Sequence, residues 1–478
     1  MILTDDEIRT LYRQGEEATV AFIRFLLQKI ESLEHRVQAL EQQLAKNSSN
    51  SSKPPSSDGY QKPAPKSLRT SSGKKSGGQP GHPGKTLAKV AQPDRVVVHP
   101  AATCPCGADL SQTAAFDYES RQVFELPPPK LEVTEHRGEI KECPDCGEKV
   151  AAPFPEGVVS PVQYGLRFRS LLVYLRDGQL LPLDRIGQLC ADLYGYDVSA
   201  ATVEAARLDC HEALEPFEGR LKDALIASDV LHADESGLRV EGKLHWLHSC
   251  SNALFTFYGV HEKRGQEAME SFGIIPLFAG VLVHDFWRPY LAYLCAHALC
   301  NAHLLRELKF LLEEMNQSWA GRMMDLLLKM LERIRELSPK RSNLPKNEMA
   351  RWLRRYGKIL KAGYEENPAP PVRVGKRGRP RKTKAQNLLE RFDLYRKNVL
   401  AFLHDFKIPF TNNQGEQDLR MLKVQQNISG GFRTLDGAKM FAGIRSYLST
   451  VRKHGLNAFD MITMALAGQP FMPRIPVG

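Results

Sequence analysis

Apolar residues near the start of the chain recur at alternating steps of three and four, with charged residues between them. This spacing is typical of a helix that presents one apolar seam in heptads. We therefore expect a helical coiled coil over residues 1–45 that joins copies of the chain into a homo-oligomer. The alternative is an amphipathic helix that packs on its own domain. The seam consists of Ile23, Leu26, Ile30, Leu33, Val37, Leu40 and Leu44.

Residues 46–100 lack the apolar positions that a core requires. The segment is rich in Ser, Gly, Pro and Lys, and carries ten Lys and Arg residues against two Asp residues. Such a composition cannot bury enough apolar surface to offset the entropy cost of ordering. We predict a disordered basic linker, which either follows the phosphates of a polyanion or is merely solvated.

Two pairs of cysteines frame residues 101–152. Two residues separate the second pair, which lets both sulfurs reach one tetrahedral ion, whereas a single proline separates the first pair. The segment between the pairs alternates like β-strands and holds His136, a substitute ligand. We predict a zinc-ribbon-like domain with structural Zn²⁺, and a site that has lost its metal is the alternative. The four cysteines are Cys104, Cys106, Cys143 and Cys146.

Residues 155–222 show no strand pattern and are predicted to form helices. Ser199 is placed to cap the third of them, and residues 194–198 would form the turn before it. One interpretation is a helix-turn-helix-like DNA-binding domain whose helix after Ser199 enters a major groove. The other is an ordinary small helical bundle.

The pattern changes again after residue 226. Three extended segments rich in Val, Leu and aromatic residues come first, and Gly or Asn separates them as in antiparallel strands. Strands then alternate with helices. This order predicts a multidomain α/β protein whose main domain, residues 226–310 plus 400–470, is a mixed sheet covered by helices. Residues 311–399 interrupt that domain as a helical insertion.

The insertion contains a basic loop, VGKRGRPRKTK. Its Arg377-Gly-Arg379-Pro core matches the AT-hook pattern, in which an extended segment enters the narrow minor groove of A·T-rich DNA. We predict that Arg377 and Arg379 bind DNA, and a chance basic run on a surface loop is the alternative.

Composition narrows the class of protein. The 478 residues are enough for about three domains, and a hydrophobic fraction of 42% excludes wholesale disorder. The net charge of +10 favours a polyanionic partner such as nucleic acid. The longest uncharged apolar stretch, residues 273–283, is too short to span a membrane, and the acidic N-terminus lacks a secretion signal. We therefore expect a cytoplasmic protein with reduced cysteines and no membrane partner.

Three acidic residues occupy the ends of predicted elements, where the backbone holds a side chain rigidly. Asp234 lies on the first strand, Asp285 ends a later strand, and Glu416 opens a helix. Mg²⁺ prefers oxygen ligands, and two such ions can activate the attacking oxygen in phosphodiester cleavage and stabilise the departing one. Alternatively, Asn413 and Glu416 fit a helix capping box, and Asp285 fits a loop start. Glu235 should point to the opposite face of the sheet.

With these motifs together, the chain resembles transposases of the insertion-sequence-66 family. The resemblance implies an RNase-H-like catalytic core that cleaves the ends of its own mobile element and joins them to target DNA. It also implies double-stranded DNA and accessory proteins of the same element as partners, and a nucleoid-associated location in a bacterium. The matching segments are the leading heptads, NSSNSSKPPSSDG, GGQPGHPG, the cysteine pairs, HADESG, LHWLHSC, VHDFWRPY, CNAHLLREL, TNNQGEQDLRMLKVQQNISGGFRT and IRSYLSTVRKHG.

The same resemblance assigns roles to single residues. It gives Asp234, Asp285 and Glu416 the catalytic positions, which would bind two Mg²⁺ or Mn²⁺ ions. Arg420, one helical turn beyond Glu416, would contact DNA phosphate or orient the carboxylate. The alternatives are a DNA-binding regulator without activity and a structure-selective nuclease with the same core. The supporting residues are Cys300, His303 and Asn413.

Overall fold

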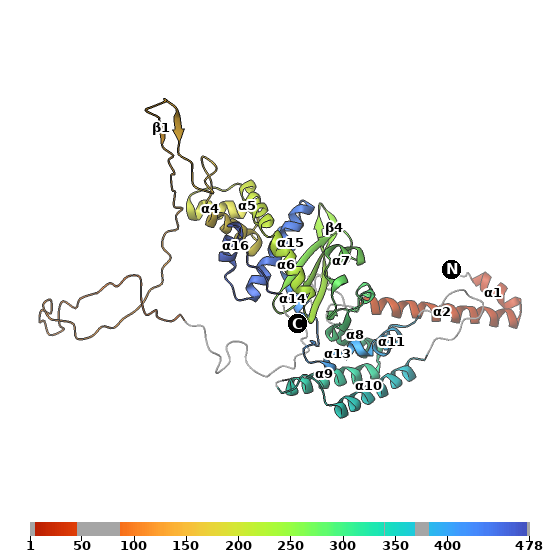
Figure 1. The fold of residues 1–478 in the computed structure, drawn as a ribbon. Helices are drawn as coiled ribbons and strands as arrows, with labels where there is room; N and C mark the ends of the chain where they lie inside the picture. Colours follow the sequence, from red (N-terminus) through yellow and green to blue (C-terminus); the bar gives the residue numbers. More distant parts are fainter. Residues whose placement is uncertain (1–4, 45–86, 339, 369–381, 476–478) are drawn as a thin grey trace. The chain divides into compact units, whose positions relative to one another are not determined.

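The computed structural model describes residues 5–338 with a gap at 45–86, and residues 340–475 with a gap at 369–381 (Figure 1). The chain forms two compact units. The small unit contains the cysteine pairs, and the large unit contains the sheet. None of the helices in the described ranges combines the length and the apolar character that crossing a bilayer requires.

The small unit contains one short hairpin. Strand β1 (Ile140–Glu142) pairs antiparallel with β2 (Lys149–Ala151), and the turn between them carries the second cysteine pair. A bridge between Thr103 and Asp109 closes the loop of the first pair. The two cysteine pairs therefore lie in two separate tight turns.

The segment between the cysteine pairs is irregular outside β1, so the prediction of alternating strands there is wrong. Its apolar and polar residues do alternate, but three consecutive prolines at residues 127–129 remove the backbone donors that a strand needs. Within the described part of the small unit, β1 and β2 pair only with each other. Alternation without a partner strand leaves the segment exposed.

A five-stranded mixed sheet in the order β5-β4-β3-β6-β7 forms the centre of the large unit. Antiparallel pairing joins the first three strands, and β6 and β7 then add in parallel to β3. This confirms the predicted α/β class with a mixed sheet. The strands are β3 (Val230–Val240), β4 (Lys243–Ser251), β5 (Thr256–His261), β6 (Val281–His284) and β7 (Ala296–Leu299).

Helices cover the sheet and its edge. On one face, α14 (Asn413–Ser429) packs Leu419 and Leu422 against Leu238 and Leu247 of the sheet. Helix α15 (Leu435–Lys453) packs along β5, and its side-chain hydroxyls accept hydrogen bonds from the backbone of that edge strand. Tyr258 N, for example, donates to Ser446 Oγ at 2.8 Å. The edge of β5 is thereby closed to further strands.

The opposite face receives α7 (Gln266–Phe272). The Phe272 ring presses on Gly259 of β5, where an added Cβ would lie 2.4 Å from the ring. Only glycine fits beneath this aromatic ring. Short 3-10 turns, η3 (Ile275–Leu277) and η4 (Arg288–Ala292), precede and follow β6.

A second core belongs to the helices after β7. Its centre is built from large buried side chains, among them Trp319, Tyr356 and Phe392. Arg377 and Arg379 fall in the gap at 369–381 and lie outside the described residues. The helices are α8 (Asn301–Met315), α9 (Ser318–Leu337), α10 (Lys346–Glu366), α11 (Lys384–Leu394), α12 (Arg396–Val399) and α13 (Ala401–His404).

Helices also precede the sheet, as predicted. Ser199 caps α5, because its Oγ accepts a bond from Thr202 N at 3.1 Å. The exposed positions of α5 are occupied by Ala, Leu, Asp and Glu, so this helix offers no exposed cation to a DNA groove. The helices are α3 (Leu166–Val173), the π-helical turn η2 (Tyr174–Gly178), α4 (Leu183–Tyr194), α5 (Ala200–Ala213), α6 (Glu215–Ile226) and, at the other end of the chain, α16 (Ala458–Leu466).

The predicted N-terminal helix is present. A short helix, α1 (Asp5–Arg13), precedes α2 (Glu16–Leu44), which contains all seven seam positions. The six seam side chains up to Leu40 are between 41% and 56% exposed. The described residues of the chain therefore leave this apolar seam largely uncovered.

Candidate active site

Asp234 lies on β3, and Asp285 directly follows the end of the neighbouring strand β6. Val230 of β3 pairs with Val281 of β6 in parallel, and His232 pairs with Val283. The pairing ends there, because the Ala233 oxygen accepts a bond from Asn412 instead, and Asp285 follows the last residue of β6. Asp234 is on the sheet face that α14 covers, and Asp285 lies within electrostatic reach of both Asp234 and Glu235.

Asp234 is surrounded by other carboxylates. Burial raises its pKa well above the ordinary value, and the charges of Glu235, Asp285 and Glu416 raise it further. Its Oδ1 accepts one bond, from Glu235 N at 2.9 Å. Burial likewise raises the pKa of Asp285, whose Oδ1 accepts a bond from Trp287 N at 3.0 Å. Asp285 is therefore a loop-start residue as well as a member of this acidic cluster.

Asn412 attaches the start of α14 to β3. Its Nδ2 donates to the backbone oxygen of Ala233 at 2.8 Å, and its Oδ1 accepts from His232 Nδ1 at 2.7 Å. Its backbone N–H donates to the Cys300 sulfur at 3.1 Å. These bonds are buried, and they hold the first turn of α14, with Glu416, next to Asp234.

The capping-box interpretation of Asn413 and Glu416 is wrong. Asn412 is the N-cap residue of α14, and no side chain caps the helix. Asn413 is exposed in the first turn. The Glu416 carboxylate turns instead toward α8, where Arg306 Nη2 lies 3.5 Å from Oε1. The capping-box spacing alone cannot show which of two adjacent asparagines, Asn412 or Asn413, is the N-cap residue.

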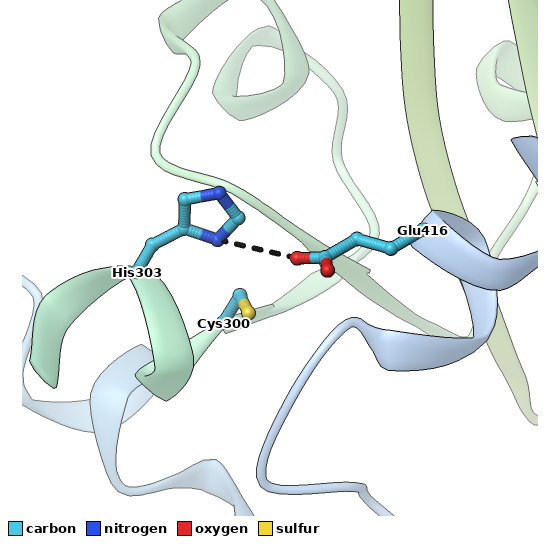
Figure 2. A group of neighbouring side chains, drawn as sticks. All are labelled: Cys300, His303 and Glu416. Carbon is cyan, nitrogen blue, oxygen red and sulfur yellow. Dashed lines mark ion pairs between the residues drawn. The ribbon is translucent and has the colours of Figure 1, made fainter. Parts of the chain in front are cut away.

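Cys300, His303 and Glu416 converge at this point (Figure 2). His303 Nδ1 lies 3.9 Å from Glu416 Oε1, and burial together with Arg306 lowers the pKa of His303 to about 4. Among the described residues, this is the group of three that brings its ligand atoms within 4.8 Å of one another. Asp234 is within electrostatic reach of Glu416, but neither Asp234 nor Asp285 is part of so close a group.

Glu235 points to the other face of the sheet, as predicted. Its Oε1 accepts a bond from Arg264 Nε at 2.9 Å, and its Oε2 accepts one from the Tyr290 hydroxyl at 2.5 Å. The Arg264 guanidinium also stacks on Trp246 and Trp287, 4.9 and 4.3 Å from the ring centroids. Glu235 therefore has a cationic partner, whereas the Asp234 carboxylate forms no ion pair within the part of the chain that the structure describes.

Two cations near the site were not found by sequence reasoning. Lys423 lies seven residues after Glu416 on the same side of α14, and its pKa is lowered by burial and raised by the charge of Asp234. Arg306 follows His303 by three residues on α8. The helical spacing could have indicated both residues. Arg420, which was predicted to bind DNA, is exposed on α14.

Each cysteine pair of the small unit favours the thiolate that binds metal. A bond from the Ala108 backbone, with Cys104, lowers the pKa of Cys106. Bonds from the Asp145 and Cys146 backbone lower the pKa of Cys143. In the described residues, no three of the four sulfurs lie within 4.8 Å of one another.

A comparison with family models decides the identity of the chain. Residues 161–440, more than half of the chain, match the model described as the Transposase IS66 family. The chain belongs to the IS66 family of transposases. The predicted family is thus confirmed, and the matched range contains Asp234, Asp285 and Glu416.

Two further models match parts of this transposase. Residues 101–147, which include all four paired cysteines, match the zinc-finger binding domain of transposase IS66. This supports the predicted structural zinc and DNA as a partner of the transposase. Residues 4–88 match a family of unknown function (DUF6444). No curated protein matches the chain.

Proposed function

We propose that this DNA transposase cleaves the ends of its insertion sequence and joins them to target DNA by phosphoryl transfer at Asp234, Asp285 and Glu416. The observation that supports the proposal is the parallel pairing of β3 with β6, which ends two residues before Asp234 and Asp285, together with the effect of the Asp285 charge on Asp234. The family match supports a transposase, and we infer an RNase-H-like topology for the sheet.

The acidic cluster fits divalent ions. Its oxygen ligands suit Mg²⁺ or Mn²⁺. Burial and the charges of the neighbouring carboxylates raise the pKa of Asp234, and bound cations would neutralise those charges. When bound, two ions supply Lewis-acid stabilisation of the attacking and departing oxygens. No Ser or Tyr nucleophile is needed, so the role of the protein is to hold the ligands.

The residues of the chain divide this task. Asp234 holds its carboxylate on β3, Asp285 holds its own at the loop start after β6, and Asn412 keeps the helix that carries Glu416 in position. Arg306 orients the Glu416 carboxylate from α8. Cys300 contributes to the same junction, because its sulfur accepts the Asn412 N–H.

Replacing Asp285 by Asn tests the proposed chemistry. We expect loss of Mg²⁺-dependent strand cleavage with binding to the element ends retained, because the fold and the basic surface are unchanged. Asp229→Asn is the matched control, since Asp229 is exposed just before β3 and pairs with Lys407. Unchanged cleavage by Asp285→Asn would refute the proposal. Equal cutting of branched and terminal-repeat substrates by the wild type would favour a structure-selective nuclease.

We also propose that Arg420 and the loop with Arg377 and Arg379 bind DNA phosphates. Deleting residues 375–382 should flatten the dependence of log affinity on log salt by about 0.9 per lost phosphate contact. An unchanged slope would show that the loop is a bystander. The helix-turn-helix interpretation of residues 155–222 stays a prediction.

The α2 seam supports a further proposal, that the transposase is a homo-oligomer joined by a coiled coil. In such a coiled coil, the six apolar side chains of the seam from Ile23 to Leu40 would pack against the same side chains of a second copy. We also propose that the transposase has accessory proteins of the same element as partners and that it is associated with the nucleoid.

A further inference from the structure

The first turns of α8 and α14 bring together three side chains with different ligand atoms. Cys300 is the N-cap residue of α8, and the two-residue gap places His303 on the same side of the helix. Glu416 reaches the pair from α14 (Figure 2). The sulfur, nitrogen and oxygen ligand atoms all lie within 4.8 Å of one another.

We propose that Cys300, His303 and Glu416 form a binding site for a transition-metal ion such as Zn²⁺, and that its occupation inhibits the transposase by taking Glu416 away from Asp234 and Asp285. The metal site stands on the geometry of the three side chains. The inhibition rests on the proposed catalytic role of Glu416.

The ligand atoms of the site are available. His303 Nδ1 is buried and has no hydrogen-bond partner within the described part of the chain. The Cys300 sulfur accepts the Asn412 N–H at 3.1 Å, and burial raises the pKa of this thiol, so a bound metal ion would displace its proton. Glu416 Oε1 lies 3.9 Å from His303 Nδ1 and is 3.5 Å from Arg306. An unpaired buried imidazole nitrogen is costly, and a metal ion would remove that cost.

The spacing suits a tetrahedral ion. Bonds of about 2.0–2.3 Å place two ligand atoms of a tetrahedral zinc ion roughly 3–4 Å apart. The observed separations therefore need side-chain shifts on the order of 1 Å, without movement of the helices. Three protein ligands leave one position open, and the soft thiolate with an imidazole selects Zn²⁺ or Co²⁺ over Mg²⁺.

Arg306 is the group that competes with the metal. Its guanidinium faces the same Glu416 oxygen, and its side chain is 22% exposed, so it can swing toward solvent. Replacing Arg306 by Gln should therefore strengthen metal binding, whereas loss of Cys300 or His303 should weaken it. These opposite signs distinguish a metal site from a general effect on folding.

Cobalt titration of the full chain tests the site. The zinc finger is first saturated with Zn²⁺, and Co²⁺ is then added while the sulfur-to-cobalt charge-transfer band is recorded. We expect one further equivalent in the wild type, and weakening by more than about tenfold in Cys300→Ser and in His303→Gln. Cys295→Ser is the matched control, because Cys295 is also a buried thiol, five residues earlier and outside the group.

The outcomes separate the two parts of the proposal. A band of unchanged strength in His303→Gln and Cys300→Ser, with circular dichroism showing folded proteins, would overturn the metal site. The second measurement compares the cleavage rate with Zn²⁺ added beyond saturation of the zinc finger with the rate without this excess. The ratio of the two rates should fall below one in the wild type and stay near one in His303→Gln. Zinc binding without this inhibition would overturn the link to Glu416. The cobalt titration needs no cleavage, so its result stands apart from that of Asp285→Asn.

Discussion

Asp234 of β3 and Asp285, the residue that follows the neighbouring strand β6, lie within electrostatic reach of each other. Burial, the charge of Asp285 and two other carboxylates keep the pKa of Asp234 well above its ordinary value. In the absence of a divalent ion, this arrangement opposes folding at neutral pH. A site that binds cations therefore lowers the stability of the folded protein when the cations are removed.

Asp234→Asn should therefore stabilise the metal-free protein. A raised carboxylate pKa in the folded state contributes stability at acid pH, which is lost as the pH rises through that value. The variant should gain on the order of 1 kcal/mol at neutral pH, since one pKa unit corresponds to about 1.4 kcal/mol. Denaturant unfolding in a chelator measures the gain, and added Mg²⁺ should stabilise the wild type but not the variant. A wild type indifferent to Mg²⁺ would contradict the metal site.

The strands and both aspartates could be predicted from the sequence because the information is local. Alternating apolar residues bounded by Gly or Asn identify β3, β4 and β5, and a carboxylate within a strand (Asp234) or directly after one (Asp285) is visible in the sequence itself. The same local pattern failed at residues 121–139, where alternation occurs without a partner strand. Strand pairing is a property of two segments, and one segment cannot reveal it.

The remaining parts of the site depend on helix packing. Asn413 was predicted to support Glu416 through a capping box, but the neighbouring Asn412 is bonded to β3 and takes the structural role. The partners of Glu416 on α8 likewise follow from how two helices meet over the sheet. Such contacts join residues more than 100 positions apart, and spacing along the chain carries no record of them.

Asn412→Ala should loosen α14 and slow cleavage. The change removes two buried hydrogen bonds and leaves His232 Nδ1 and the Ala233 oxygen unpaired, at about 1–3 kcal/mol for each unsatisfied group. Cleavage rate should fall more than affinity for the element ends, because Glu416 loses its position while the DNA contacts stay. Asn413→Ala, the exposed neighbour, is the control, and an equal effect of both changes would argue against the positioning role.

Arg207→Ala should strongly destabilise the helices before the sheet. The Arg207 guanidinium makes two bonds of 2.7 Å to Asp177, and both side chains are buried. Removing the arginine leaves an unpaired buried carboxylate, at about 3–5 kcal/mol of unfolding free energy. Arg169→Ala, which breaks the more exposed pair with Asp209, should cost about 1 kcal/mol or less. Equal losses in urea unfolding would contradict this account.

His248 should make the sheet less stable in acid. The side chain is buried beneath α7, and burial lowers its pKa to about 4. Between that value and about 6.5 the unfolded chain binds a proton that the folded chain does not, so stability falls as the pH falls, by up to about 1.4 kcal/mol per pH unit. Unfolding free energies measured across this range should have a shallower slope in His248→Gln than in the wild type, and parallel slopes would contradict the prediction.

Ile30→Asp should convert the transposase to a monomer if α2 forms a coiled coil. Ile30 lies in the middle of the exposed seam, and a carboxylate there would be buried without a partner in each copy of the assembly. Ser32→Asp introduces the same charge on the outer side of the same turn and should leave the mass measured by sedimentation unchanged. If the seam instead packs on its own domain, Ile30→Asp would lower the free energy of unfolding while the mass stays that of a monomer in all three proteins. The sedimentation masses of the wild type and the two variants therefore decide between the two interpretations of the heptads.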